Sequence, residues 1–417
     1  MTETADTDWP TVRLGDILDR RTEIVHPKNN PTGPATFVGL EHIDKGTGIR
    51  LGSEPIEKSE LTGRRAQFYE GDIVYGYLRP YLNKVWVAEF GGLCSVDQYV
   101  YTYDPDRVDP EFVAAFMRSP LFLSRAPVGD SPGQLPRIRA GEVDAVELSL
   151  PSLSVQRQIA DDLSARRAEV QDLLAALQDQ VAAAEELPAA YLRSAFEGVE
   201  ASRRRGVEAS RWPTVRLSEI ADLIPARSLS RDGDAEVLAA TSACLTESGF
   251  SADGLKAARM SADSVAQATL SPGEVLLARS NTPELVGRAS LYEGDPTGVV
   301  ASDLLIRVRV GPRAEPSYVG HYLSHLYLSG YWAERAGGAS GTMKKVRRTQ
   351  VRAVEMTLPP LDVQRRVVGA LRQQQAGVRA LVSGLQSQER AASALPGALL
   401  QAAFEGVGRR TPIPTAG

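Results

Sequence analysis

The chain has 417 residues, of which 43% are hydrophobic and 24% charged, and its formal net charge is −5. This length predicts two domains or more, and no apolar run reaches the roughly 18–20 residues needed to cross a bilayer. Two isolated cysteines, Cys94 and Cys244, exclude a disulfide framework and, with an acidic start that is no secretory signal, indicate the cytoplasm. Because the chain is acidic, any nucleic-acid contact must come from local basic patches.

The first globule contains two distinctive segments. Glu70-Gly71-Asp72-Ile73-Val74 reads as a turn that leads into a buried strand. Near the globule's end lies the polar, glycine-containing segment 131–139, and after Pro151 the sequence changes character.

From there the apolar residues follow alternating three- and four-residue steps, which predicts a long heptad helix. The predicted stripe, broken at Arg166 and ending at Pro188, consists of Val155, Ile159, Leu163, Val170, Leu173, Leu177, Val181, Ala184 and Leu187. About 33 residues would form a rod of about 50 Å. A separate short helix is expected beyond Pro188, with Gly198 as its stop.

The same order of features then recurs. Trp9-Pro10-Thr11-Val12-Arg13-Leu14 repeats letter for letter from Trp212, the block Leu150–Arg157 returns as Leu358–Arg365, and Ala195-Phe196-Glu197-Gly198-Val199 repeats from Ala403. The second stripe, broken at Gln374 and Glu389 and ending at Pro396, consists of Val363, Val367, Leu371, Val378, Leu381, Leu385, Ala392 and Leu395. Between these blocks the copies have diverged, and a period this long indicates domain duplication and not a solenoid.

The duplication predicts an α+β fold in which an α/β globule followed by a long helix occurs twice. The two helices are expected to pair as an antiparallel coiled coil, because a long helix with a narrow apolar stripe needs a partner. The alternative is that each helix packs on its own globule. The predicted divisions are a first globule (1–151), a helical spacer (152–198), a linker (199–211), a second globule (212–359), a second helical spacer (360–407) and a flexible tail (408–417).

Three features occur twice in the chain: a globule ending in Leu-Pro-x-Leu-x-x-Gln, a heptad helix and a terminal Ala-Phe-Glu-Gly. Together they resemble the specificity subunit of type I restriction–modification systems. The stretch Gly71-Asp72-Ile73-Val74 through Leu78-Arg79-Pro80-Tyr81-Leu82-Asn83-Lys84-Val85 looks like a signature of that family's target recognition domains. The second copy departs from it, with Leu277-Ala278-Arg279-Ser280-Asn281-Thr282 at this place.

This resemblance implies a non-catalytic, cytoplasmic subunit that binds double-stranded DNA. Each target recognition domain would read one half of a bipartite site, and the helices would set the spacing and dock two methyltransferase subunits. Two restriction subunits would join for cleavage. No cofactor is implied for this chain itself: S-adenosylmethionine, and ATP with Mg for restriction, belong to the partners. The sequence gives neither the DNA target nor evidence for a restriction subunit.

Residues that read bases need planar or bidentate donors. In the first domain we expect DNA contacts from the turn residues Arg79, Tyr81, Asn83 and Lys84, with the alternative that Arg79 and Tyr81 only brace the turn. Further candidates there are Gln134, Arg137 and Arg139. In the second domain the candidates are Arg279, Asn281, Thr342, Lys344, Lys345, Arg347 and Arg348, of which the last four form a dense basic cluster suited to phosphates.

Weaker basic candidates are Arg64 and Arg65, and Arg203 to Arg205 fit a solvated linker better than an interface. Enzyme interpretations lack their residues. His321 and His325 have the spacing of a zinc helix without its Glu base, and Gly341-Thr342-Met343-Lys344 lacks the ending of a phosphate-binding loop. The main alternative function is a coiled-coil scaffold that binds proteins without recognising a DNA sequence.

Overall fold

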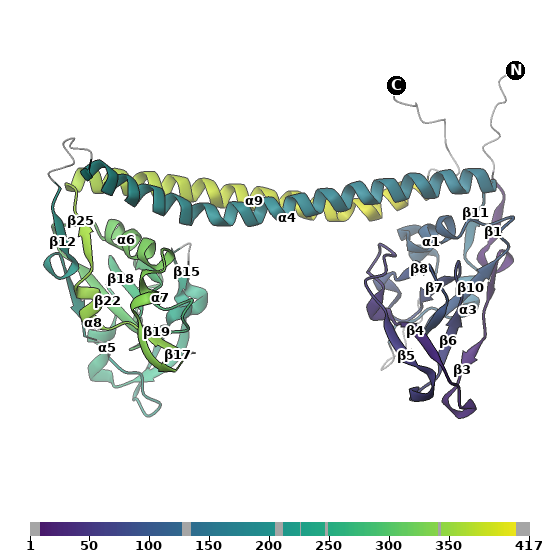
Figure 1. Ribbon diagram of the computed structural model, residues 1–417, viewed down its shortest axis with the longest axis horizontal. Helices are drawn as coiled ribbons and strands as arrows, with labels where there is room; N and C mark the ends of the chain where they lie inside the picture. Colours follow the sequence, from purple (N-terminus) through teal and green to yellow (C-terminus); the bar gives the residue numbers. More distant parts are fainter. Residues whose placement is uncertain are drawn as a thin grey trace, which may run out of the picture. The chain divides into compact units, whose positions relative to one another are not determined.

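The computed structural model describes residues 9–126, 135–204, 212–225, 227–246, 249–340 and 343–405. Its contacts divide the chain into two compact units: unit 1 is Met1–Gln178 with Ser387–Gly417, and unit 2 is Asp179–Gln386. Both divisions fall inside long helices, α4 (Leu153–Arg204) and α9 (Leu361–Glu405). Each unit therefore combines one α+β globule with part of each long helix (Figure 1). The finer domain divisions drawn from the sequence stay a prediction.

Unit 1 contains a two-stranded sheet, β1-β11, a four-stranded sheet in the order β2-β10-β7-β8 and a five-stranded sheet in the order β3-β6-β9-β4-β5. Gly71, at φ +85°, makes the turn that the sequence predicts before β7, and all four residues of that strand are buried. The strands are β1 (Thr11–Arg13), β2 (Leu18–Arg20), β3 (Ile24–Val25), β4 (Pro34–Val38), β5 (Glu54–Glu57), β6 (Arg65–Phe68), β7 (Ile73–Gly76), β8 (Val85–Val87), β9 (Gly92–Ser95), β10 (Gln98–Tyr103) and β11 (Glu147–Ser149).

Unit 2 repeats this framework with the sheets β12-β25 and β13-β22-β18-β20, and Gly273 takes the place of Gly71 at φ +86°. The other sheets differ: β17-β14-β21 has three strands, and β15-β16 and β19-β24-β23 are small. The strands are β12 (Thr214–Arg216), β13 (Ala221–Ile224), β14 (Ala235–Ala240), β15 (Leu245–Thr246), β16 (Gly249–Phe250), β17 (Lys256–Met260), β18 (Glu274–Ala278), β19 (Ser280–Asn281), β20 (Ala289–Tyr292), β21 (Val299–Ala301), β22 (Leu305–Val310), β23 (Gly337–Ser340), β24 (Met343–Lys345) and β25 (Glu355–Thr357).

Three of the shorter helices of each unit also repeat, and α5 occurs in unit 2 alone among the described residues. Proline opens α1 and α6 at the first helical position, where its missing N–H costs nothing. The set comprises α1 (Pro110–Arg118), α2 (Pro120–Arg125) and α3 (Ala140–Asp144) in unit 1, and α5 (Ala262–Ala268), α6 (Pro316–Leu328), α7 (Tyr331–Arg335) and α8 (Arg348–Arg352) in unit 2. Within the described ranges, no helix combines the length and the apolar character needed to span a membrane.

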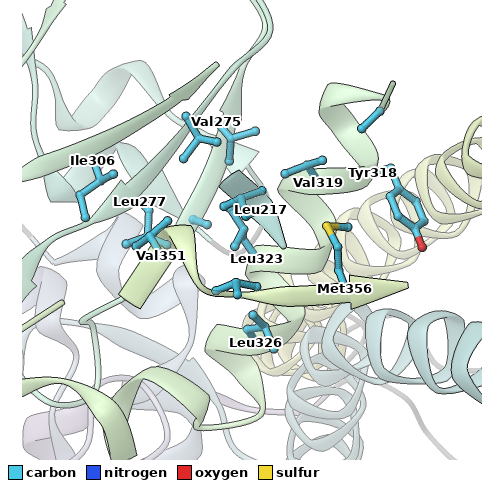
Figure 2. Close-up of a cluster of buried hydrophobic side chains, with 14 of the residues drawn as sticks. Leu217, Val275, Leu277, Ile306, Tyr318, Val319, Leu323, Leu326, Val351 and Met356 are labelled. Atoms are coloured by element: carbon cyan, nitrogen blue, oxygen red, sulfur yellow. The ribbon is translucent and has the colours of Figure 1, made fainter. Parts of the chain in front are cut away.

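The core of unit 2 lies between its four-stranded sheet and α6. Val275 and Leu277 of β18 and Ile306 of β22 share one cluster with Tyr318, Val319 and Leu323 of α6. Figure 2 shows these side chains together with Leu217, which follows β12, with Val351 of α8 and with Met356 of β25. Burial of each such side chain stabilises the fold by about 1.5–3 kcal/mol.

The long helices pack antiparallel within each unit. In unit 1, Ala160 near the start of α4 shares a core cluster with Phe404 near the end of α9, and Gln178 Nε2 donates to Glu389 Oε1 at 3.1 Å. In unit 2, Phe196 of α4 lies in one cluster with Leu371 of α9. The predicted antiparallel pair is confirmed, and since these clusters include globule residues, the helices also pack on the globules.

The predicted stripe is wrong by one residue in part of each helix. Leu173 is 45% exposed and Leu381 is 47% exposed, whereas the next residues, Leu174 and Val382, are partly buried. Leu395, at 41% exposure, also lies outside the stripe. The stripe reaches the buried Leu177 through Leu174 and the buried Leu385 through Val382, which is the second residue of each apolar pair. The polar breaks are Arg167 and Gln375 instead of Arg166 and Gln374.

The prolines do not end the helices, which is a second correction. Pro188 and Pro396 lie inside α4 and α9. Buried residues continue beyond each proline, at Leu192 and Leu400. Each follows the previous buried residue of its helix, Ala184 or Ala392, at a spacing one residue longer than a heptad. Proline removes one backbone hydrogen bond and crowds the preceding turn. The packing of apolar residues on both sides of it offsets that cost.

A buried glutamine at the start of each long helix fastens the helix to its globule. Gln156 is fully buried; its Oε1 accepts from the Asp109 N–H at 2.9 Å, and its Nε2 donates to the Arg107 and Pro151 carbonyls at 3.0 and 2.9 Å. Gln364 is also fully buried and accepts from the Glu315 N–H at 2.8 Å. This explains why the motif's glutamine recurs.

The corrected stripe makes a testable distinction between two leucines of one helix. Leu177 is 5% exposed and Leu173 is 45% exposed. We expect Leu177→Ala to lower the free energy of unfolding by about 2–5 kcal/mol because it leaves a cavity. Leu173→Ala should change it by less than about 0.5 kcal/mol. Urea titrations followed by circular dichroism measure both, and equal losses would contradict the register.

Candidate nucleic-acid interface

In unit 1 the first candidate segment is a strained turn after β7. Arg79 (φ 50°, ψ 61°) and Asn83 (φ 49°, ψ 54°) adopt left-handed backbone conformations on either side of the 3₁₀ turn Pro80–Leu82. A non-glycine residue in this region costs about 1–3 kcal/mol and persists only where its surroundings fix it. Such strain is concentrated at functional sites, so the turn is a candidate for binding.

The four candidates in this turn fall into two pairs. Asn83 is buried, with the whole residue 8% exposed. Its side-chain amide donates to the Arg118 carbonyl inside the protein. Lys84 Nζ donates to the Leu40 carbonyl at 2.6 Å. Arg79 is exposed, and Tyr81 is 57% exposed. This changes the expected role of Asn83 from DNA contact to support of the turn.

The second candidate segment lies directly against this turn. The Arg79 N–H donates to the Pro136 carbonyl at 2.8 Å, and the Ile138 N–H donates to the Tyr77 carbonyl at 3.2 Å. Leu78 and Arg137 form an isolated antiparallel bridge. The turn therefore lies beside Arg137, which is partly buried, and Arg139, which is exposed. Gln134 lies outside the described residues.

Two tyrosines that the sequence analysis did not single out stand next to these segments. The rings of Tyr77 and Tyr99 stack at 4.2 Å with 17° between their planes, and the Arg20 guanidinium lies 5.5 Å from the Tyr99 ring centre. Burial raises the pKa of Tyr77, Asp97 adds to the rise, and Arg137 opposes it. Tyr77 lies within the signature stretch from Gly71 to Val85, and this position is the only sequence signal that points to it.

Unit 2 brings its two candidate segments together in the same way. Strand β19 pairs antiparallel with β24, with Ser280 opposite Lys345 and Asn281 opposite Lys344. The Val346 N–H donates to the Arg279 carbonyl at 2.8 Å, as the Ile138 N–H does to Tyr77 in unit 1. Thr342 lies outside the described residues.

Side chains at this edge differ in what they are free to do. Lys345 and Arg347 are exposed and Lys344 is partly buried. Arg348 is used internally, because its Nη2 donates to the Leu223 and Ile224 carbonyls at 2.8 and 2.6 Å. Burial lowers the pKa of Arg348, and the charges of Arg352 and Arg279 lower it further.

The remaining candidates are separate from these edges or lie where side chains are not described. Arg65 Nη1 donates to the Arg64 carbonyl at 3.0 Å, and its guanidinium lies 5.1 Å from the Phe37 ring centre. The side chains of Arg203 and Arg204, and the whole of Arg205, lie outside the described residues. Where side chains are described, no group of three His, Cys, Asp or Glu could hold a metal ion.

No known family model matches the sequence. The type I restriction enzyme EcoDI specificity subunit of Escherichia coli is 26% identical over 191 residues, which cover 46% of this chain and 42% of that protein. A putative type I restriction enzyme MjaX specificity subunit of Methanocaldococcus jannaschii is 27% identical over 113 residues, 26% of each chain. The matches thus span less than half the length of these curated relatives.

Two solved structures match nearly the whole chain. One chain, from a structure described as the basis of "complex assembly" and "conformational transition of the type I R-M system", has a TM-score of 0.68 and 22% identity over 95% of this chain and 97% of that one. The HsdS subunit of Thermoanaerobacter tengcongensis has a TM-score of 0.62 and 22% identity over 98% of this chain and 100% of its own. The fold is therefore the duplicated α+β fold of HsdS subunits. The resemblance to type I specificity subunits that the sequence motifs indicate is confirmed.

The contrast between Asn83 and Tyr81 can be tested by their stabilities. We expect Asn83→Ala to lower the free energy of unfolding by about 1–3 kcal/mol, because the Arg118 carbonyl loses its buried partner. Tyr81→Ala should change it by less than about 0.5 kcal/mol, since the ring is 57% exposed. Both are measured by urea unfolding; a neutral Asn83→Ala would show that the amide does not support the turn.

Proposed function

We propose that this chain is the non-catalytic DNA-sequence-specificity subunit of a type I restriction–modification complex. The observation that carries the proposal is the arrangement shared by both units. In each one, the segment after a buried strand pairs through its backbone with a second, cation-bearing segment. Each unit would read one half of a bipartite site in double-stranded DNA.

The side chains at these edges suit the two tasks of a DNA-binding surface. Exposed Lys and Arg neutralise phosphates and fix the position of the protein on the duplex. Bidentate Arg and Asn side chains distinguish base pairs in the major groove. We assign the first task to Arg139, Lys345 and Arg347, and the second to Arg79, Arg137 and Asn281.

The partners follow from the same proposal. Two methyltransferase subunits would dock on the long helices and use S-adenosylmethionine, and restriction subunits would use ATP with Mg. On these helices Leu173 and Leu381 face solvent at equivalent positions. Exposed leucines on an otherwise polar helix surface favour a protein contact. Because α4 and α9 contribute to both units, their length would set the spacing between half-sites. We place the complex in the cytoplasm.

The DNA contacts of unit 2 can be tested in the complex with its methyltransferase partner. We expect Lys345→Ala and Arg347→Ala each to weaken binding of the cognate duplex about tenfold and to reduce the slope of log affinity against log salt by about 1. Electrophoretic titrations at several salt concentrations measure both quantities. Asn281→Ala should instead relax the methylated motif in one half-site, which methylome sequencing detects.

A matched control is Arg313→Ala, which removes an exposed arginine from the turn before α6. It should leave affinity and salt slope unchanged. Equal losses in all the cation variants would mean that DNA is attracted by overall charge and not by the proposed edge.

The docking proposal has a test that does not involve DNA. We expect Leu173→Asp with Leu381→Asp to abolish co-purification of the methyltransferase while the chain stays folded, because both side chains are about half exposed. The control substitutions are Ala175→Asp and Ser383→Asp, at exposed positions on another face of the same helices. Retention of the partner by the leucine variant would show that it docks elsewhere.

A further inference from the structure

Unit 2 contains a cavity of about 580 Å³ between α6, α9, β20 and the β15-β16 hairpin. One face of α6 supplies Ser317, Gly320, His321 and Ser324, and α9 supplies Arg372, Gln375 and Arg379. Pockets that bind small molecules measure about 300–1,000 Å³ and combine apolar walls with a few convergent polar groups. This cavity has a volume in that range and a mainly polar lining that also contains the apolar side chains Leu192, Phe250 and Leu291. It includes none of the candidate DNA-contact residues.

Three of the positions at which the two copies of this helix differ line the cavity. Where α1 has Glu111, Ala115 and Arg118, α6 has Ser317, His321 and Ser324. Arg118 is 7% exposed and its Nη1 donates to the Val85 carbonyl at 3.2 Å. At the equivalent place in unit 2, the Ser324 hydroxyl donates to the Ala289 carbonyl at 3.1 Å.

The short serine satisfies the same backbone carbonyl as the arginine but leaves the arginine's space unfilled. The matching space in unit 1, lined by Glu111, Ala115, Arg118 and Arg167, has a volume of only about 40 Å³. Unit 1 fills this place with its own guanidinium, and unit 2 leaves it open.

Two arginines of α9, Arg372 and Arg379, line the cavity together with two carboxylates, Glu293 and Asp295. Arg372 Nη2 donates to Ser317 Oγ at 3.0 Å and to Glu293 Oε1 at 2.8 Å, and the side chains of this ion pair are 55% and 69% exposed. Within the described residues, Arg379 has no hydrogen-bond or ion-pair partner. Exposed pairs are weak, so a bound anion can compete with Glu293 for Arg372.

The histidine on the α6 side of the cavity is uncharged near neutral pH. Burial first, and the charge of Arg372 second, lower the pKa of His321 to about 4. The carboxylate of Asp295 acts on Tyr292, whose pKa rises chiefly through burial and additionally through this charge.

We propose that this cavity binds a small organic anion, one with a phosphate or carboxylate group and an apolar part. The anionic group lies between Arg372 and Arg379 and accepts a hydrogen bond from the Ser317 hydroxyl, whose oxygen already accepts from Arg372. The apolar part packs against Leu192, Phe250 and Leu291, which line the same cavity. The site is a property of unit 2 alone, because Arg118 closes its counterpart.

The test uses the full-length chain and three probes: phenyl phosphate, phenylacetate and inorganic phosphate. Isothermal titration calorimetry should show saturable binding of at least one aromatic anion, with a dissociation constant of about 1 mM or lower. The other aromatic anion distinguishes phosphate from carboxylate recognition. Inorganic phosphate should bind at least about tenfold more weakly because it lacks the apolar part.

Three variants locate the binding. S317E/H321A/S324R transfers the α1 residues onto α6, fills the cavity and should abolish saturable binding. R379E should weaken binding at least about tenfold. R365E, an exposed arginine of α9 that does not line the cavity, is the matched control and should bind as the parent chain does. Thermal melts check that each variant is folded.

The proposal would be overturned if neither aromatic anion showed saturable binding. Equal binding of inorganic phosphate, equal loss in R365E and R379E, or undiminished binding in the cavity-filled variant would also overturn it. If that variant does not fold, the comparison of R379E with R365E still decides the question.

Discussion

The attachment of each long helix to its globule by one buried glutamine is the constraint on which the rest of the structure depends. Gln156 and Gln364 are fully buried, and each accepts a hydrogen bond from the backbone of the residue that precedes α1 or α6. A hydrogen bond of this kind contributes about 0.5–1.5 kcal/mol, but an unpaired buried amide costs more. In each unit, the start of the long helix, the short helix α1 or α6 and the four-stranded sheet therefore hold one fixed arrangement.

This attachment explains which parts of the chain stay alike in the two copies and which do not. The four-stranded sheets have the same strand order, and α1 and α6 both lie between sheet and long helix. The second sheets are free of that constraint and differ, with five strands in unit 1 and three in unit 2. On α6 itself, Ser317 and Ser324 line a cavity where α1 has Glu111 and Arg118 beside a much smaller space.

Much of this could be predicted from the sequence because repetition and period are visible in it. The duplication, the α+β class, the buried β7 and the antiparallel helices all follow from patterns. The stripe was misplaced at Leu173 and Leu381 because each adjoins a second apolar residue, and only packing decides between the two. The helix through Pro188 could not be foreseen, since the compensating contacts come from residues distant in the sequence. The site residues were found singly. That Arg79 meets Pro136 and Asn281 meets Lys344 depends on long-range backbone pairing, which no local pattern encodes.

Both candidate edges are held together by backbone hydrogen bonds, and this has a consequence for their chemistry. Leu78 stands opposite Arg137 in unit 1, and Ser280 stands opposite Lys345 in unit 2, although the residue pairs have nothing in common. The hydrogen bonds that join each pair of segments, Ile138 to Tyr77 and Val346 to Arg279, involve only main-chain atoms. Because these bonds do not depend on side-chain identity, the exposed residues can change without loss of the edge. A surface built this way can acquire a new pattern of donors and cations while the buried Ile138 and Val346 keep its position.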